Sequence, residues 1–349
     1  MIIEKSIIAP KLTKLKSFIL KSSTDPVQGV LFKDNCLTVT NFEIGIKTPL
    51  EAITDETFII TPRAIELIEN LPDGAIEIIP DENYSITIKA ARIKNKFQSY
   101  DPKMFPKLES QSPDTKAGKI SSLNFDKAIK SVIYAVAGFT TKPIFGGILF
   151  DSSKGKLNLV GCDGYRLAWS KIDYENEFSF VVPKTSIQKL MSIGISGDIE
   201  VAYNDRNAIF KSEEYTVYTR LLEGTYLAYQ NMFIKRDNKT TINRITLLEA
   251  IKRCTICADE KNKSIVKLQL EDEKLTISTN SETSEYIEEI KLEAPADEPL
   301  TIAFNGVYLI EFLKSFDCEN IQFFFGSPVQ PMIAENGEQS ALVLPVKTN

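Results

Sequence analysis

The feature that most limits how this chain can fold is a threefold internal repeat with a period of about 117 residues. Stretches beginning at Gly29, Gly147 and Ile265 each show two strands of alternating pattern, a polar turn between them and a further strand. Any α+β protein contains loosely similar blocks, but matched order and spacing along the whole chain argue against coincidence. The sequence therefore predicts three copies of one structural unit.

Each predicted unit also contains two helices. One helical segment precedes each of the three stretches, at 11–23, 125–138 and 244–258. A strand and a second helix follow each stretch, and Pro62, Pro183 and Asn305 fall where strand becomes helix; proline suits the first helical turn. More strands close each unit. We expect an α+β fold with about eight short strands and two helices per unit.

The predicted domains are residues 1–115, 120–237 and 241–349. The stretches between them are polar, with SQSPDTKAGK at 110–119 and KRDNKTTIN at 235–243. A chain of 349 residues has room for two or three domains. It contains no apolar run long enough to span a membrane and no signal-peptide pattern at the N-terminus, so we expect a cytoplasmic protein.

Histidine and cysteine usage argues against catalysis and metal binding. The chain has no histidine, which removes the commonest general base and the commonest metal ligand. Its five cysteines are an odd number and are scattered, which indicates reduced thiols. Cys254 and Cys257 form a lone CxxC late in a helical run, so we expect ordinary helix cysteines. No cofactor and no metal are expected.

The net charge of −6 and the pI of about 5.2 look unfavourable for binding DNA. In the predicted helices, however, cationic side chains flank the apolar face in equivalent positions; around Leu12, Leu15 and Phe18, for example, lysines form a stripe. A lysine on an exposed helix face is often only solvated. Recurrence in several helices favours a basic lining that faces DNA within an acidic body. The predicted DNA-facing residues are Lys11, Lys14, Lys21, Arg63, Lys127, Lys130, Lys142, Lys184, Lys189, Lys252, Arg253 and Lys314.

Several motifs then resemble one family. The stretch 161–168, GCDGYRLA, resembles the A-T-D-G-H-R-L-A signature of the bacterial sliding clamp, the beta subunit of the replicative DNA polymerase. The segment 303–309 is similar to its F-N-x-x-Y-L motif, 327–329 to its S-P-V turn, and 341–347 to its closing L-x-L-P-V-R. The matches occur in the right order between residues 161 and 347, which makes the resemblance specific.

The resemblance implies a head-to-tail homodimer in which six clamp-type domains form a ring around duplex DNA. In such a ring the helices face the DNA and the sheets lie outside. DNA would be held without sequence preference, because base contacts would create stopping points for sliding. The implied partners are the replicative polymerase, the clamp loader, and repair and translesion proteins, which bind through short linear peptides. The implied protein is a processivity factor and not an enzyme.

The resemblance also implies a peptide cleft between the second and third domains, because an apolar pocket with a few polar anchors suits a short peptide. The matching positions are Phe145, Gly164, Tyr165, Arg166, Leu167, Met232, Asn305, Tyr308, Pro328, Val343, Leu344, Pro345 and Val346.

This sequence departs from the family pattern at a few of these places. Tyr165 replaces the usual histidine and Cys162 a threonine, the F-P-D-Y motif is Tyr-Leu-Ala-Tyr at 226–229, and Asn231 replaces an arginine. These departures leave peptide preference open.

Two other classes of protein stay in view. One is an enzyme, either a thiol oxidoreductase built on Cys254 and Cys257 or a carboxylate hydrolase, although no phosphate loop or nucleophile elbow supports it. The other is a divergent clamp-fold protein that acts as an interaction scaffold without encircling DNA.

Overall fold

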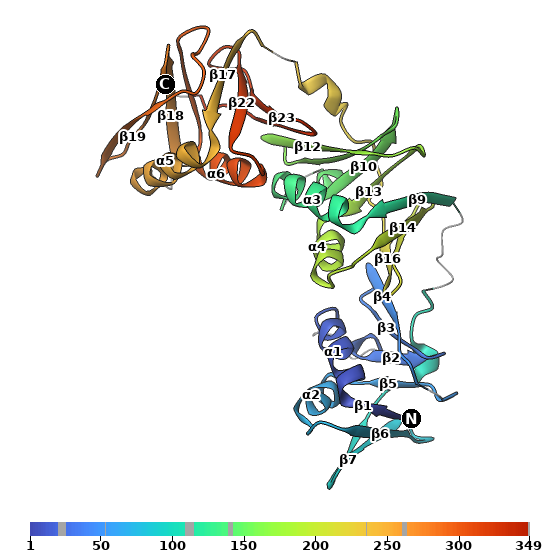
Figure 1. Cartoon of the computed structure of the whole chain (residues 1–349). Helices are drawn as coiled ribbons and strands as arrows, with labels where there is room; N and C mark the ends of the chain where they lie inside the picture. The colour runs from blue at the N-terminus through green and yellow to red at the C-terminus, as the bar shows by residue number, and fades with distance from the viewer. Residues whose placement is uncertain are drawn as a thin grey trace. The chain divides into compact units, whose positions relative to one another are not determined.

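The computed structural model describes residues 1–19, 26–52, 54–108, 115–138, 142–234, 236–259 and 264–347. Along these residues one order of elements occurs three times: a strand, a helix, four strands, a second helix and three strands. The predicted α+β class and threefold repeat are thus confirmed at the level of secondary structure (Figure 1).

The three copies have the following bounds. The first contains β1 (Ile2–Glu4), α1 (Lys5–Lys16), β2 (Val30–Lys33), β3 (Cys36–Thr40), β4 (Ile44–Pro49), β5 (Phe58–Ile60), α2 (Pro62–Asn70), β6 (Ala75–Pro80), β7 (Ser85–Ala90) and β8 (Ile93–Gln98). The second contains β9 (Thr115–Ser121), α3 (Ser122–Val132), β10 (Gly147–Ser153), β11 (Lys156–Cys162), β12 (Arg166–Asp173), β13 (Phe178–Pro183), α4 (Lys184–Ser192), β14 (Asp198–Tyr203), β15 (Asn207–Lys211) and β16 (Thr216–Arg220). The third contains β17 (Asn238–Asn243), α5 (Arg244–Cys257), β18 (Ile265–Glu271), β19 (Lys274–Asn280), β20 (Glu285–Lys291), β21 (Leu300–Asn305), α6 (Gly306–Ser315), β22 (Asn320–Phe325), β23 (Met332–Asn336) and β24 (Gln339–Val343).

The residues at the strand-to-helix junctions lie where the sequence predicts. Pro62 is the first residue of α2, Pro183 is the last residue of β13 directly before α4, and Asn305 caps α6. The Asn305 side chain accepts hydrogen bonds from the amides of Val307 at 2.9 Å and Tyr308 at 3.4 Å. Such caps satisfy main-chain donors that a helix start would otherwise leave without partners.

The first helix begins earlier than predicted. It spans Lys5–Lys16 and contains Pro10, whereas the sequence favours a start at Lys11. Proline removes one main-chain donor, so it usually marks a helix start; here it lies in the second turn. The predicted apolar face is correct, since Leu12, Leu15 and Phe18 are all buried.

The chain forms two compact units, and each is described by itself. Unit 1 is Met1–Leu123 with Thr185–Leu221, and unit 2 is Asn124–Lys184 with Leu222–Asn349. The units divide the second repeat between them, so they do not coincide with the predicted domains 1–115, 120–237 and 241–349. Those boundaries remain a prediction from the repeat.

Each unit contains a four-stranded and an eight-stranded antiparallel sheet. The orders are β1-β6-β7-β8 and β5-β2-β3-β4-β16-β15-β14-β9 in unit 1, and β20-β19-β18-β21 and β13-β10-β11-β12-β24-β23-β22-β17 in unit 2. The eight-stranded sheets combine strands of two successive repeats, through the pairs β4·β16 and β12·β24. Among the described strands, β8 and β20 lie at sheet edges. In its repeat β8 is the equivalent of β16 and β24, and β20 is the equivalent of β4 and β12.

The helices cover the sheets in pairs. In unit 1, α1 and α2 pack side by side, and in unit 2, α5 packs against α6 and against β17 to β20 (Figure 1). Buried Leu247 and Ile251 of α5 meet Leu268 of β18 and Phe323 of β22 in this core. Burying large apolar side chains in this way is the main contribution to the stability of the fold.

Candidate functional site

A tight turn between β11 and β12 carries the motif Asp163-Gly164-Tyr165-Arg166. The Asp163 carboxylate accepts hydrogen bonds from the amides of Tyr165 at 2.9 Å and Arg166 at 3.0 Å. Gly164 has a φ of +89°, a conformation that strains residues with a Cβ. The Asp-Gly pair therefore forms the turn. These hydrogen bonds give Asp163 a structural role, and no catalytic role is needed to explain its presence.

The turn positions a buried cation. Arg166 is 7% exposed, and its guanidinium donates to Asp163 Oδ2 at 2.9 Å, Glu311 Oε2 at 2.5 Å and the Tyr134 carbonyl oxygen at 2.9 Å. Its central carbon lies 5.2 Å from the ring centroid of Tyr134 and 4.3 Å from that of Tyr308. Burial alone would lower the pKa of Arg166, but Glu311 and Asp163 outweigh it and raise the pKa. Arg166 therefore stays charged.

The carboxyl-terminal segment runs beside this turn. The strand β24 pairs with β12, and the chain beyond it continues the contact, since the Leu344 amide donates to the Tyr165 carbonyl at 2.8 Å. Further on, the Val346 amide donates to the Ala303 carbonyl at 2.8 Å. The tail therefore joins the Arg166 turn to the strand that leads into α6.

The first turn of α6 completes a surface with apolar side chains at its rim. The Asn305 cap fixes the helix start, which places the Tyr308 ring 6.2 Å from the Tyr165 ring. Tyr165 is 58% exposed, Val307 46% and Leu344 39%. We call the set Tyr165, Arg166, Asn305, Val307, Tyr308 and Leu344 the Tyr165 surface.

The remaining predicted cleft residues have other environments. Gly164 belongs to the turn itself, Val343 is buried in β24, and Pro345 and Val346 are half-buried in the tail. Leu167 lies in a buried apolar cluster, with Phe145 packed against it. Among the described contacts, none ties the exposed Met232 or Pro328 to the Arg166 turn.

Several residues that sequence reasoning missed hold this region together. Tyr134 and Glu311 bind Arg166 directly, as described above. In the altered motif at 226–229, the Tyr226 hydroxyl donates to the Val160 carbonyl at 3.3 Å and the Tyr229 hydroxyl donates to Asp151 Oδ2 at 2.7 Å. Two tyrosine hydroxyls thus anchor a segment that lacks the family's proline. The spacing of Glu311 three residues after Tyr308, on one helix face, was the available signal for Glu311.

The predicted DNA-facing residues that the structure describes lie on the helices α1 to α6, except Lys142, which precedes a 3-10 turn. Lys14, Arg63, Lys127, Lys130, Lys142, Arg253 and Lys314 are exposed, Lys11, Lys184, Lys189 and Lys252 are half-buried, and Lys21 lies outside the described residues.

Several of these cations have partners in the same chain. Lys14 donates to the Ile193 carbonyl at 3.1 Å and Lys184 to the Val136 carbonyl at 3.0 Å. Other cations approach rings or carboxylates: Lys189 lies over Phe18, Lys11 is 3.8 Å from Glu214, Lys252 is 2.7 Å from Glu249 and Arg253 is 2.6 Å from Glu288.

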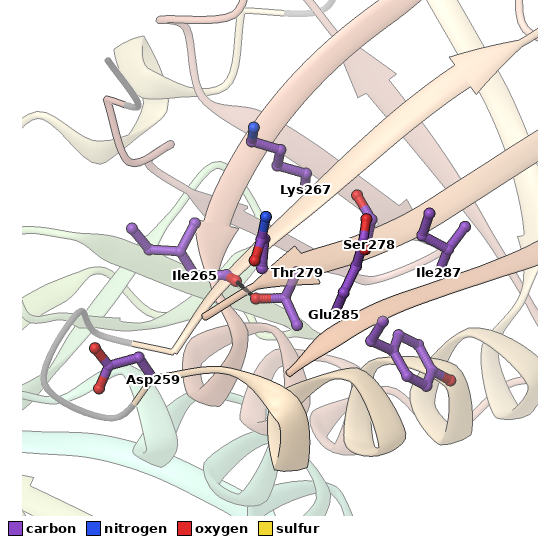
Figure 2. Close-up of a pocket in the computed structure, with 9 residues that line it drawn as sticks. Asp259, Ile265, Lys267, Ser278, Thr279, Glu285 and Ile287 are labelled. Carbon is purple, nitrogen blue, oxygen red and sulfur yellow. Dashed lines mark hydrogen bonds between the residues drawn. The ribbon is translucent and has the colours of Figure 1, made fainter. Parts of the chain in front are cut away.

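A separate cavity of about 390 Å³ lies at the exposed face of the sheet formed by β18, β19 and β20 (Figure 2). It includes none of the predicted site residues. Its lining residues are Asp259, Ile265, Lys267, Ser278, Thr279, Asn280, Glu285, Tyr286 and Ile287.

Other kinds of site have little support. Within the described residues no group of three or more His, Cys, Asp or Glu side chains is placed to hold a metal ion. In the same residues no helix is long and apolar enough to cross a membrane. Cys254 and Cys257 are free thiols, and Cys254 is buried.

Comparison with known proteins identifies the fold. It is similar to a crystal structure of the DNA polymerase III subunit beta from Pseudomonas aeruginosa, with a TM-score of 0.93, 22% identity and full coverage of both chains. It is also similar to a sliding clamp from that organism bound to griselimycin, with a TM-score of 0.92, 22% identity, and 100% of this chain and 99% of that chain covered. The chain thus has the fold of the sliding clamps.

The sequence gives the same result. Residues 119–228 match the family described as DNA polymerase III beta subunit, central domain, and residues 234–346 match its C-terminal domain. The beta sliding clamp of Streptococcus pneumoniae serotype 4 is 28% identical over 299 residues, covering 82% of this chain and 78% of that protein. The chain belongs to the DNA polymerase III beta subunit family, the bacterial beta sliding clamps.

Proposed function

We propose that this chain is a cytoplasmic, non-enzymatic DNA sliding clamp, two copies of which close head to tail around duplex DNA and tether a polymerase to it. The observation that carries the proposal is the pattern of sheet sharing. Two repeat boundaries are bridged by strand pairs, β4·β16 and β12·β24. The equivalent strands at the two ends of the repeat series, β20 and β8, are left as edges that a second copy would pair.

The internal pairs supply the register for this contact. The turns before β4, β12 and β20 share one main-chain hydrogen bond, which makes Gly45, Leu167 and Glu285 equivalent. The turns before β7 and β15 differ in length by one residue, but each closes with a main-chain hydrogen bond to the carbonyl of the first strand residue, Ser85 or Asn207. Lys96 of β8 therefore takes the place of Tyr218 of β16. Since Tyr218 lies opposite Gly45, Lys96 would lie opposite Glu285 of a second copy.

The charges of the two edges suit this register. β8 has Lys94 and Lys96 and no acidic residue, whereas β20 contains Glu285, Glu288 and Glu289. In the same register Lys94 lies opposite Ile287, with Glu285 and Glu289 as its diagonal neighbours. Opposite charges across paired strands are favourable and discourage wrong registers.

The ring explains how an acidic protein can stay on DNA. Enclosure requires only that the clamp cannot fall off, so weak contacts from exposed cations such as Lys127, Lys130 and Arg63 suffice. Such contacts read no sequence and permit sliding.

Partners would bind at the Tyr165 surface through short peptides of the Q-x-x-L-F type. Exposed Tyr165, Val307 and Leu344 offer apolar contact, while Arg166 and Asn305 supply polar anchors. A few apolar pockets with placed polar groups are what peptide capture needs. The proposed partners are the replicative polymerase, the clamp loader and repair proteins.

The test is retention on circular DNA. The protein is loaded onto a nicked plasmid with a clamp loader and ATP, and gel filtration follows it before and after the plasmid is linearised. We expect a dimer, twice 39.2 kDa, that elutes with the circle and is released by linearisation. A sample without loader is the control. A monomer that binds the peptide and never joins the circle would instead favour an interaction scaffold.

A further inference from the structure

Two cations donate hydrogen bonds to main-chain carbonyls in, and directly after, a short 3-10 turn of unit 2, η4 (Ile133–Ala135). Arg166 Nη2 donates to the Tyr134 carbonyl oxygen at 2.9 Å, and Lys184 Nζ donates to the Val136 carbonyl oxygen at 3.0 Å. Hydrogen bonds from charged donors are about twice as strong as neutral ones. The turn also contacts α6, β11 and β12. η4 is therefore a link between Lys184 and the Arg166 network.

The surroundings of Lys184 suit this link. Lys184 is half-buried at the start of α4, and the charged groups that face it are Arg166, Glu311 and Asp163. Burial lowers the pKa of Lys184 and the charge of Arg166 lowers it further, while Glu311 and Asp163 partly offset both effects. Arg166 binds both carboxylates directly, whereas the Lys184 ammonium is hydrogen-bonded to the Val136 carbonyl oxygen.

We propose that Lys184 is a positioning residue for the peptide-binding surface, because it fixes η4 and so presents Tyr134 to Arg166 in the geometry that holds the Tyr308 ring. The inference rests on the proposed peptide binding at the Tyr165 surface. It moves Lys184 out of the predicted DNA-facing set, since its ammonium is already bound within unit 2.

The experiment compares three full-length variants: Lys184→Met, Lys184→Arg and, as a matched control, Lys189→Met. Lys189 is on the same helix, is also half-buried and has a pKa that burial lowers, but it lies over Phe18. Affinity for a labelled, acetylated Q-x-x-L-F peptide is measured by fluorescence anisotropy, and retention on nicked circular DNA is measured in parallel.

We expect Lys184→Met to weaken peptide binding by about tenfold, the value of one hydrogen bond from a charged group. Lys184→Arg keeps a charged donor and should stay within about twofold of the parent protein, as should Lys189→Met. DNA retention should not change in either Lys184 variant. Unchanged peptide affinity in Lys184→Met, or a loss confined to DNA retention, would overturn the inference.

A pH series separates positioning from a general packing defect. If the ammonium is needed, peptide affinity of the parent protein falls as pH rises through the lowered pKa of Lys184, before an ordinary lysine titrates at about 10.4. Lys184→Arg stays charged and should show a flat profile. Equal profiles for the two proteins would contradict the proposal.

Hydrogen exchange keeps the inference separate from the proposed function. If the parent protein binds no peptide, the proposed cleft fails, and amide exchange over residues 133–137 still tests the link. Lys184→Met should accelerate exchange there and Lys189→Met should not. No acceleration would overturn the positioning role by itself.

Discussion

At the scale of single residues, the site shows how one buried cation organises its neighbours. Arg166 meets two carboxylates, a main-chain carbonyl and two tyrosine rings. A buried charge is tolerated only when its donors are satisfied, so removal of a single partner would leave the others in unfavourable surroundings. The Arg166 network is therefore a rigid base for the exposed apolar rim formed by Tyr165, Val307 and Leu344.

Cys254 gives a residue-level prediction, since it separates a clamp from a thiol enzyme. Burial raises the pKa of Cys254 to about 12, so its nucleophilic thiolate is scarce at neutral pH. We expect iodoacetamide at about pH 8 to leave Cys254 unmodified in the folded protein while the half-exposed Cys257 reacts. Mass spectrometry of the digested protein reads the result, with unfolded protein as the control.

The raised pKa of Cys254 also determines how the free energy of unfolding changes with pH. Because the folded thiol holds its proton to a higher pH than the unfolded thiol, with a pKa of about 8.5, unfolding releases a proton in between. The free energy of unfolding should therefore fall as pH rises from about 8.5 toward 12. Cys254→Ala should reduce that slope, whereas rapid labelling of Cys254 in the folded protein would contradict the burial argument.

The sequence allowed part of the site to be predicted. The matched motifs named Tyr165, Arg166, Asn305 and Tyr308, which the fold brings together, because each lies at a turn or helix start with a recognisable local pattern. Glu311 was missed although it follows Tyr308 by three residues on one helix face, and Tyr134 was missed because only the tertiary fold brings it to Arg166. The partners of Lys184 were missed for the same reason, since a helical pattern indicates which face is polar but not what that face meets.

At the scale of elements, most of the fold could be predicted from the sequence because the same pattern occurs three times. Alternating strands, helix faces and junction residues such as Pro62 and Asn305 agree in every repeat. The start of α1 was predicted too late, at Lys11, whereas the helix begins at Lys5 and contains Pro10. Strand pairing between repeats, β4·β16 and β12·β24, has no local signal, because it joins edges far apart in the sequence.

The edge strands give the element-level prediction. Lys94→Glu with Lys96→Glu should weaken the dimer by roughly a hundredfold, because like charges placed opposite one another cost several kcal/mol. Mixing this variant with one that carries Glu285→Lys and Glu289→Lys should restore a heterodimer. Analytical ultracentrifugation measures both. Lys89→Glu, one strand from the edge, is the matched control, and a dimer that is indifferent to the β8 reversal would rule out this register.

At the scale of the whole molecule, the proposed function depends on enclosure more than on any one contact. The chain is acidic, with a net charge of −6, and several predicted DNA-facing cations bind groups of their own chain. Strong attraction to DNA is therefore not what this composition provides. A closed ring needs no such attraction.

This gives a prediction about residence on DNA. Replacing one exposed cation, for example Lys127→Ala, removes at most about one phosphate contact and should change the lifetime on circular DNA by less than about twofold. The variant Lys94→Glu with Lys96→Glu should abolish residence on circular DNA, although it leaves the exposed helix cations Lys127, Lys130 and Arg63 in place. Surface-immobilised circles with labelled protein supply the lifetimes. A large loss from Lys127→Ala alone would mean that affinity, not topology, retains the protein.

The two unlike edges have a consequence for assembly size. Because a subunit has two different edges, β8 and β20, any open assembly keeps one free edge at each end. Growth stops only when these two free edges pair with each other. An assembly whose two free edges cannot meet would grow into an open fibre. In the proposed ring, a substitution that alters the angle between neighbouring repeats and spares both edges should therefore convert a closed dimer into an open polymer.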